Sequence, residues 1–196
     1  LTPGLKHFEV DLFGEEPIPT GLIDSGQIRD KAGLSQLLKT LRQKLGEPCL
    51  MVSLPEEHAF VIHLNLPYMK AANLRSSIEL QLEQYIPIKP EDAVFDYEVV
   101  KWPAERGDNY ELAITVFPKA LVMDYHAALT EAGFRVLAYE IEAQAIARAV
   151  VKYQNPQTIM AIDFGKTRTS FFVTSGAKVL FTSTLSNVGG ENLTQS

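Results

Sequence analysis

The sequence predicts an α/β protein, because segments with the periodicity of strands alternate with segments that have the periodicity of helices. Apolar residues recur at helical spacing after Asp30, where Leu34 and Leu38 lie on one stripe and Gly46 ends the pattern. A half-buried strand is predicted over 60–66, where one set of residues alternates with another: Phe60, Ile62, Leu64 and Leu66 with Val61, His63 and Asn65. Hydrophobic residues make up 46% and charged residues 21% of the chain, as in globular proteins with a buried core.

The same periodicities, with Gly and Pro as punctuation, predict the other elements in order. The apolar run 49–54 predicts a central strand that is covered on both faces. The further predicted helices lie at about 70–85, 118–133 and 142–153. The further predicted strands lie at 6–13, 18–23, 94–102, 110–117, 134–141, 158–163, 169–174 and 178–185.

Charge and composition exclude several classes of function. The formal net charge is -6, which argues against a general electrostatic grip on nucleic acid or on anionic lipid. No apolar stretch reaches the roughly 18–20 residues that span a bilayer, and no signal-peptide pattern opens the chain. The four histidines show no metal-ligand spacing, and no P-loop or nucleophile elbow occurs. The chain opens without Met, so we expect a piece of a longer protein.

The segment 162–169 carries the clearest candidate chemistry. A strand ends in Asp163, which could hold magnesium through water, and Gly165 would let a ligand approach the backbone. Turn N–H groups and threonine hydroxyls could cradle phosphate oxygens, with Lys166 and Arg168 adding positive charge. From the local spacing alone, an ordinary β-hairpin turn is the favoured interpretation. The candidate phosphate-binding residues are Asp163, Gly165, Lys166, Thr167 and Thr169, and the candidate metal ligand is Asp163.

A second candidate patch is the glycine pair Gly189 and Gly190, which precedes a predicted helix start. Backbone N–H groups at such a position could face an anion. Glycine before a helix is equally explained by a tight turn.

Several segments together resemble the PilM family of type IV pilus assembly proteins. The most specific is SSIELQLEQYIP at 76–87, followed by EDAVFDY at 91–97. The alanine-rich helix at 142–149 is similar to a later helix of that family. Residues 163–169 and 189–194 resemble the second phosphate hairpin and the Gly-Gly turn of actin-like ATPases. These matches keep the family order and extend over nearly the whole chain.

The resemblance implies a fragment of an actin-like, ribonuclease H-like fold with an inserted subdomain of β-α-β-β-α-β order. Residues 1–55 and 138–154 would form part of the first actin-like subdomain. Residues 56–137 would form the insertion, and 157–196 would begin the second actin-like subdomain.

The resemblance also implies a function. The chain would be a cytoplasmic scaffold at the inner face of the membrane, associated with it indirectly and serving pilus assembly and twitching motility. It would bind the cytoplasmic tail of a PilN-like membrane protein and other pilus proteins, with homo-oligomers possible and no nucleic acid. The parent protein would bind ATP and magnesium. The first phosphate loop and the adenosine region are missing here, so we expect no bound nucleotide and no hydrolysis in this fragment.

Two alternatives follow from relatives of the same superfamily. One is an FtsA-like, polymerising actin-type ATPase of cell division. The other is the nucleotide-free cytoplasmic domain of a type II secretion scaffold.

Overall fold

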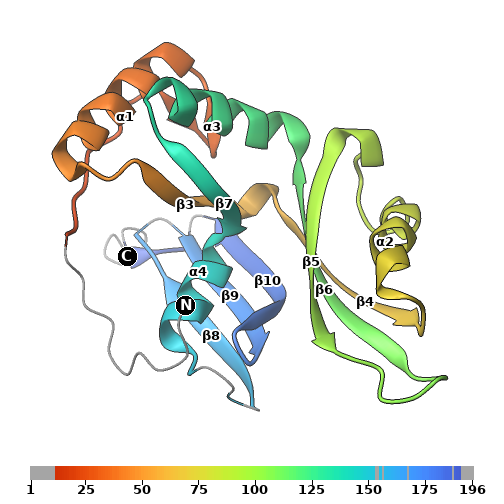
Figure 1. Cartoon of the computed structure of the whole chain (residues 1–196). Coiled ribbons are helices and arrows are strands. Elements are labelled where there is room, and N and C mark those ends of the chain that lie inside the picture. The colour runs from red at the N-terminus through yellow and green to blue at the C-terminus, as the bar shows by residue number, and fades with distance from the viewer. Residues whose placement is uncertain (1–11, 153–154, 156, 167, 187, 191–196) are drawn as a thin grey trace. The chain divides into compact units, whose positions relative to one another are not determined.

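The computed structural model describes residues 12–152, 155, 157–166, 168–186 and 188–190 (Figure 1). Its internal contacts divide the chain into two compact units. The first comprises 1–51 and 123–138, and the second comprises 52–122 and 139–196. The subdomain boundaries that the sequence suggests stay a prediction.

The first unit is built on two helices, α1 (Lys31–Leu45) and α3 (Lys119–Glu131), of which α3 enters this unit at Met123. As predicted, Asp30 caps α1 by accepting a hydrogen bond from the Gly33 N–H at 2.9 Å, and Gly46 ends it at φ 73°. The two helices lie side by side (Figure 1). The polar contacts between them include the Lys31–Asp124 ion pair at 2.6 Å, the Lys39–Glu131 ion pair at 3.5 Å and the hydrogen bond from Ser35 Oγ to the Ala128 carbonyl at 3.1 Å.

One sequence prediction for this part of the chain is wrong. In place of a strand over 18–23, a small hairpin pairs β1 (Ile23–Asp24) with β2 (Gln27–Ile28). Pro17 and Pro19 cannot donate to a ladder, which prevents strand pairing before Ile23. The predicted strand 6–13 lies mostly outside the described residues.

The apolar run 49–54 forms a strand, as predicted, but this strand is not covered on both faces. It is β3 (Cys49–Leu54), and it pairs with β7 (Arg135–Ile141). Met51 is 54% exposed. The apolar run therefore indicated the strand correctly and its burial incorrectly.

The second unit contains a three-stranded antiparallel sheet in the order β4-β6-β5, with α2 (Leu74–Leu82) packed on it. The alternation of β4 follows the prediction, and its even-numbered apolar residues point into the core. The helix is shorter than the predicted 70–85. It ends at Leu82, and Tyr85, which is 50% exposed, lies beyond its end. The strands are β4 (Phe60–Pro67), β5 (Ala93–Lys101) and β6 (Asn109–Pro118). The buried core is Ile62, Leu64, Leu66, Leu74, Ile78, Leu82, Ile86, Tyr110, Leu112, Ile114 and Val116.

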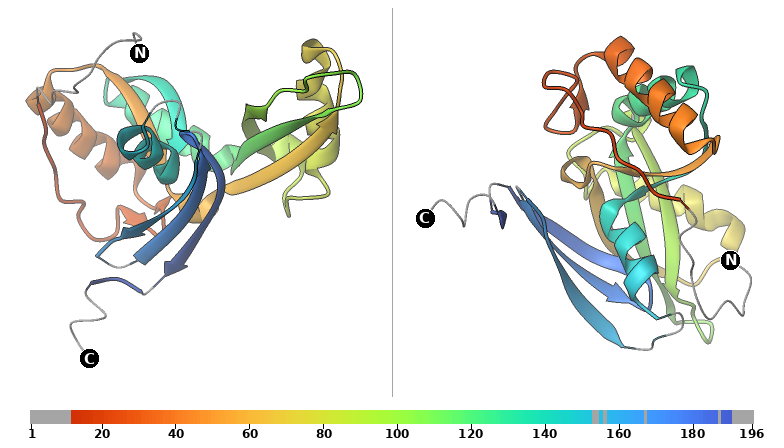
Figure 2. Two further views of the ribbon diagram at one scale, coloured as in Figure 1. Left: turned by 90° about the horizontal axis from the view of Figure 1, so that it is seen from below. Right: turned by 90° about the vertical axis from the view of Figure 1, so that its left-hand side faces the viewer.

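The same unit contains a second three-stranded antiparallel sheet, in the order β10-β9-β8. Helix α4 (Glu142–Val150) lies against one of its faces (Figure 2). The strands are β8 (Thr158–Phe164), β9 (Arg168–Ser175) and β10 (Lys178–Ser186). All three were predicted within a residue or two. No helix in the described part of the chain combines the length and the apolar character needed to cross a bilayer.

Candidate functional site

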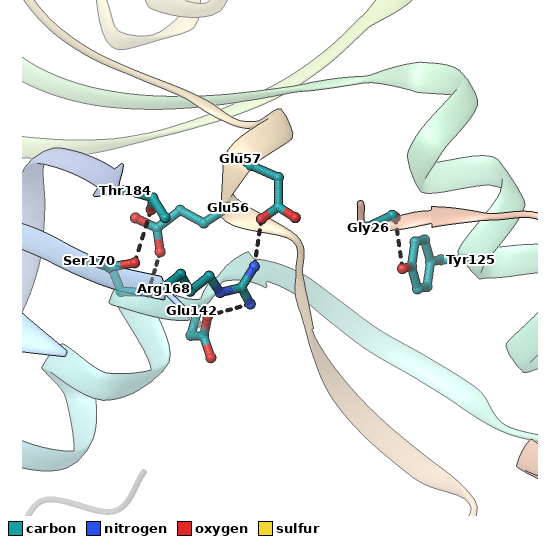
Figure 3. Close-up of polar contacts among 9 residues, drawn as sticks. Gly26, Glu56, Glu57, Tyr125, Glu142, Arg168, Ser170 and Thr184 are labelled. Atoms are coloured by element: carbon teal, nitrogen blue, oxygen red, sulfur yellow. Dashed lines mark hydrogen bonds and ion pairs between the residues drawn. The ribbon is translucent and has the colours of Figure 1, made fainter. Parts of the chain in front are cut away.

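The predicted site residue Asp163 lies near the end of β8, on the face of the sheet that α4 covers. In the register of the sheet, Asp163 stands opposite Ser170 on β9, which stands opposite Thr184 on β10. Ser170 is buried, and its Oγ lies 2.9 Å from the Thr184 Oγ1 (Figure 3). Asp163 itself is half-buried. The carboxylate therefore lies in a row of polar groups on the covered face.

The tip of the β8–β9 hairpin requires glycine for a reason of space. The Gly165 N–H donates to the Arg168 carbonyl at 2.9 Å, and a Cβ on Gly165 would lie 2.9 Å from that oxygen. No ordinary Cβ contact is as short. Gly165 thus permits a tight closure of the hairpin, as the turn interpretation of this spacing predicts.

The structure brings the second predicted patch directly against the hairpin. A Cβ on Gly189 would lie 2.6 Å from the Lys166 oxygen and 2.7 Å from the Arg168 nitrogen. The Gly190 N–H donates to the Gly165 carbonyl at 3.0 Å. The two patches are 24 positions apart in sequence (189 minus 165) but form one backbone-to-backbone contact.

Two of the predicted phosphate-binding groups already have protein partners. Thr169 is 4% exposed, and its Oγ1 donates to the Val188 carbonyl at 2.6 Å. The Gly190 N–H is held by Gly165. Both groups therefore fasten the Gly-Gly turn to the hairpin. The side chain of Lys166 is exposed, and Thr167 lies outside the described residues.

Arg168 is paired with two carboxylates, so it does not supply the free positive charge that the sequence suggests. Its guanidinium contacts Glu57 at 2.8 Å and Glu142 at 3.4 Å (Figure 3). Arg168 lies on the covered face of the sheet, where the first residue of α4 and the short 3₁₀ helix Glu56–His58 both reach it. We call Arg168, Glu57 and Glu142 the arginine clamp. Sequence reasoning missed it, because Glu57 is 111 positions away from Arg168 and no local pattern joins them.

Glu56 lies beside the arginine clamp and is the most deeply buried acid of this region, at 6% exposed. Its Oε2 accepts a hydrogen bond from the Ala143 N–H at 3.2 Å in the first turn of α4, while its Oε1 is buried without a partner in the described part of the chain. Burial raises the pKa of Glu56 from 4.5 to about 7, and the nearby Glu142 and Asp163 carboxylates also raise it. The Ala143 hydrogen bond and the Arg168 charge lower that pKa.

The local balance of charge limits what this site can bind. Arg168 faces the carboxylates of Glu57 and Glu142, and Asp163 is near enough to Glu56 to raise its pKa. A phosphate would therefore meet negative charge unless a cation came with it. In the residues that the structure describes, no group of three or more His, Cys, Asp or Glu side chains could hold a metal ion.

The order of strands and helices, together with the solved structures that share it, gives this chain an actin-like fold. The chain belongs to the family of type IV pilus assembly proteins PilM, which it matches over residues 2–196.

Two solved structures share the fold of this chain. The chain is similar to a protein solved in a PilM–PilN type IV pilus biogenesis complex, with a TM-score of 0.77 and 20% identity over 92% of this chain and 55% of that one. It is also similar to the cytoplasmic domain of EpsL, an inner-membrane component of the type II secretion system of Vibrio cholerae. That match has a TM-score of 0.55 and 13% identity, and it covers 78% of this chain and 56% of that one. The chain spans little more than half the length of either structure.

Proposed function

We propose that this chain is part of a scaffold in the type IV pilus assembly machine, and that it binds a short cytoplasmic tail of a PilN-like inner-membrane protein. The observation that carries the proposal is the family match over residues 2–196. The similar protein solved in a PilM–PilN complex supports it, because a protein with the same fold is found there together with PilN. Capture of such a tail would hold the chain at the inner face of the membrane.

Polar groups at the candidate site are already paired within the protein, which favours a binding role over a catalytic one. Arg168 is neutralised by two carboxylates, and Thr169 donates to a backbone carbonyl. These groups stabilise the hairpin and α4 in the folded state. A peptide can be bound by backbone hydrogen bonds and side-chain pockets without any catalytic residue. Such a scaffold would need no reactive group.

Binding of a synthetic PilN-like tail peptide to residues 1–196 tests the proposal. We expect saturable changes in the amide spectrum of the chain and none with a peptide of the same composition in scrambled order. Unchanged spectra at saturating peptide would contradict tail binding by this chain. A matching response to a tail from a type II secretion partner, with none from the pilus peptide, would favour the secretion scaffold.

We propose further that the parent protein binds ATP with magnesium, and that Asp163, Gly165 and Lys166 line one side of the phosphate site. The close contact of the hairpin with the Gly189–Gly190 turn supports this, because it fixes the hairpin tip. When bound, magnesium would neutralise phosphate charge beside the carboxylates of this region. The role of Lys166 is to present an ammonium group to the phosphates from its exposed position.

Calorimetry on residues 1–196 tests how much of that site is present here. We expect no magnesium-dependent heat of ATP binding, because one side of a phosphate site leaves most of the nucleotide in water. A clear signal at micromolar ATP would contradict this expectation. Sedimentation of polymer on addition of ATP would favour the FtsA-like alternative.

A further inference from the structure

Two groups that can bind an anion lie close together in the second unit and already hold carboxylates of the chain. The Arg168 guanidinium pairs with Glu57 at 2.8 Å (Figure 3), and the Ala143 N–H, in the first turn of α4, donates to the Glu56 Oε2 at 3.2 Å. Glu56 and Glu57 are neighbours in one short 3₁₀ helix between β3 and β4. We call Glu56 and Glu57 the acidic plug.

The guanidinium and the start of α4 belong to one place in the fold. Glu142, the first residue of α4, contacts Arg168 at 3.4 Å. A helix N-terminus carries partial positive charge on its unpaired N–H groups, and a guanidinium presents a fork of N–H donors that matches an oxyanion. Ile141 precedes the helix and has no side-chain oxygen to cap it, so Glu56 caps Ala143 from 87 positions away. An anion is therefore bound here, and the chain itself supplies it.

Glu56 fills this position incompletely. The residue is 6% exposed, and its Oε1 is buried with no partner in the residues that the structure describes, while Oε2 is bound by Ala143. A buried carboxylate oxygen without a hydrogen bond is costly. The position thus attracts an anion, but the carboxylate that occupies it leaves one oxygen unsatisfied.

We infer that the acidic plug blocks an oxyanion site formed by Arg168 and the first turn of α4, and that a phosphate group binds there when the plug withdraws. The inference rests on the proposed ATP site, because Arg168 adjoins the hairpin tip that lines that site. It adds an autoinhibitory contact to it, in which the chain's own acids compete with the phosphate. Glu142 and Asp163 keep their negative charge nearby, so the phosphate would bind together with magnesium.

Titration of residues 1–196 with magnesium pyrophosphate tests the inference, because this probe carries the phosphate oxygens without the nucleoside. The variant Glu56→Gln/Glu57→Gln keeps the shape of the plug and removes its charge. We expect it to bind the probe at least about tenfold more tightly than the unaltered chain, since a tethered competitor of like charge is lost. The amide signals of Ala143 and Arg168 should report the binding.

A matched variant controls for net charge. Glu79→Gln/Glu83→Gln removes the same two charges from exposed positions on α2 and should leave the affinity unchanged. Arg168→Gln, added to the plug variant, should abolish the gain. Glu57→Gln alone changes a side chain that is 28% exposed, so it keeps the buried Glu56 contact and should show part of the gain in a folded chain.

Three results would overturn the inference. One is equal affinity for magnesium pyrophosphate in the unaltered chain, in Glu57→Gln and in the plug variant. Another is an equal gain in Glu79→Gln/Glu83→Gln, which would make the effect one of net charge. The third is a gain that survives Arg168→Gln, which would place the anion elsewhere.

Lys166→Gln separates the failure of this inference from the failure of the proposed ATP site. If Lys166→Gln weakens binding of the probe but neutralising the plug changes nothing, the phosphate site stands and the plug is refuted. If neutralising the plug strengthens binding but Lys166→Gln and Asp163→Asn have no effect, the plug stands and the proposed lining of the ATP site is refuted.

Discussion

The two sheets of the second unit have the same number of strands and the same antiparallel pairing, but they differ in the side chains on the face that no helix covers. In the β4-β6-β5 sheet, the apolar face lies under α2, and His63 and Asn65 of β4 point to solvent. In the β10-β9-β8 sheet, the face under α4 combines buried Phe172 and Val179 with the hydroxyls of Ser170 and Thr174. Met160, Ile162 and Phe164 of β8 lie exposed on the opposite face. The first sheet is therefore buried on its apolar face and exposed to solvent on its polar face. The second sheet exposes large apolar side chains on the face that α4 does not cover.

Truncation of a core side chain in the first sheet should have the largest effect. Ile78 is fully buried between α2 and the sheet, so Ile78→Ala should lower the free energy of unfolding by about 2–5 kcal/mol. Leu80→Ala, two positions away and 80% exposed, should change it by less than about 0.5 kcal/mol. Urea unfolding monitored by circular dichroism measures both. Equal effects would show that α2 does not cover this sheet as described.

The buried acid beside the second sheet should make stability depend on pH. The folded state raises the pKa of Glu56 from 4.5 to about 7, so it binds more protons than the unfolded state between these values. The contribution from protonated Glu56 is complete below pH about 4.5 and is lost as the pH rises through about 7, by about 3 kcal/mol at most.

A pair of neighbouring variants isolates this contribution. Glu56→Gln cannot ionise, and it should abolish the fall in unfolding free energy over that pH range. Glu57→Gln removes one carboxylate of the arginine clamp, leaves Glu56 in place and should retain the fall. Urea unfolding at several pH values compares the two, and an undiminished fall in Glu56→Gln would refute the assignment.

The contact between the hairpin and the Gly-Gly turn should discriminate between two adjacent glycines. Gly189→Ala would place a Cβ 2.6 Å from the Lys166 oxygen, and the backbone must move to relieve this contact. We expect a loss of about 1–3 kcal/mol in the free energy of unfolding. Gly190→Ala meets its nearest atom at 3.9 Å and should be tolerated. Thermal unfolding of both variants checks this, and the reverse order would be inconsistent with the contact.

Substitution on the face of the second sheet that α4 does not cover should have the smallest effect on the stability of this chain. Ile162→Thr changes a side chain that is 57% exposed, so the free energy of unfolding should shift by less than about 0.5 kcal/mol. Phe172→Ala, from the covered face of the same sheet at 1% exposed, should cost about 3–5 kcal/mol. A large loss at Ile162 in urea unfolding would mean that this face is already buried in the chain.

Sequence reasoning was strongest where one local pattern decided the outcome. Helix α1 was predicted from its apolar stripe, Asp30 and Gly46, and strand β4 was predicted from the alternation over 60–66. It failed where burial depends on distant partners. The run 49–54 suggested two covered faces, yet Met51 is 54% exposed. The predicted strand at 18–23 ignored the two prolines before Ile23.

The sequence by itself determined the α/β class, the order of the elements, the segments that resemble PilM and the position of Asp163 at a strand end. These depend on spacings of a few residues, which the backbone periodicities set directly. Only the tertiary structure showed that Gly189 packs on Lys166, that Arg168 is held by Glu57 and Glu142, and that Glu56 is buried beside them. Such contacts join residues up to 111 positions apart, and whether a side chain is paired or desolvated is decided by its neighbours in space.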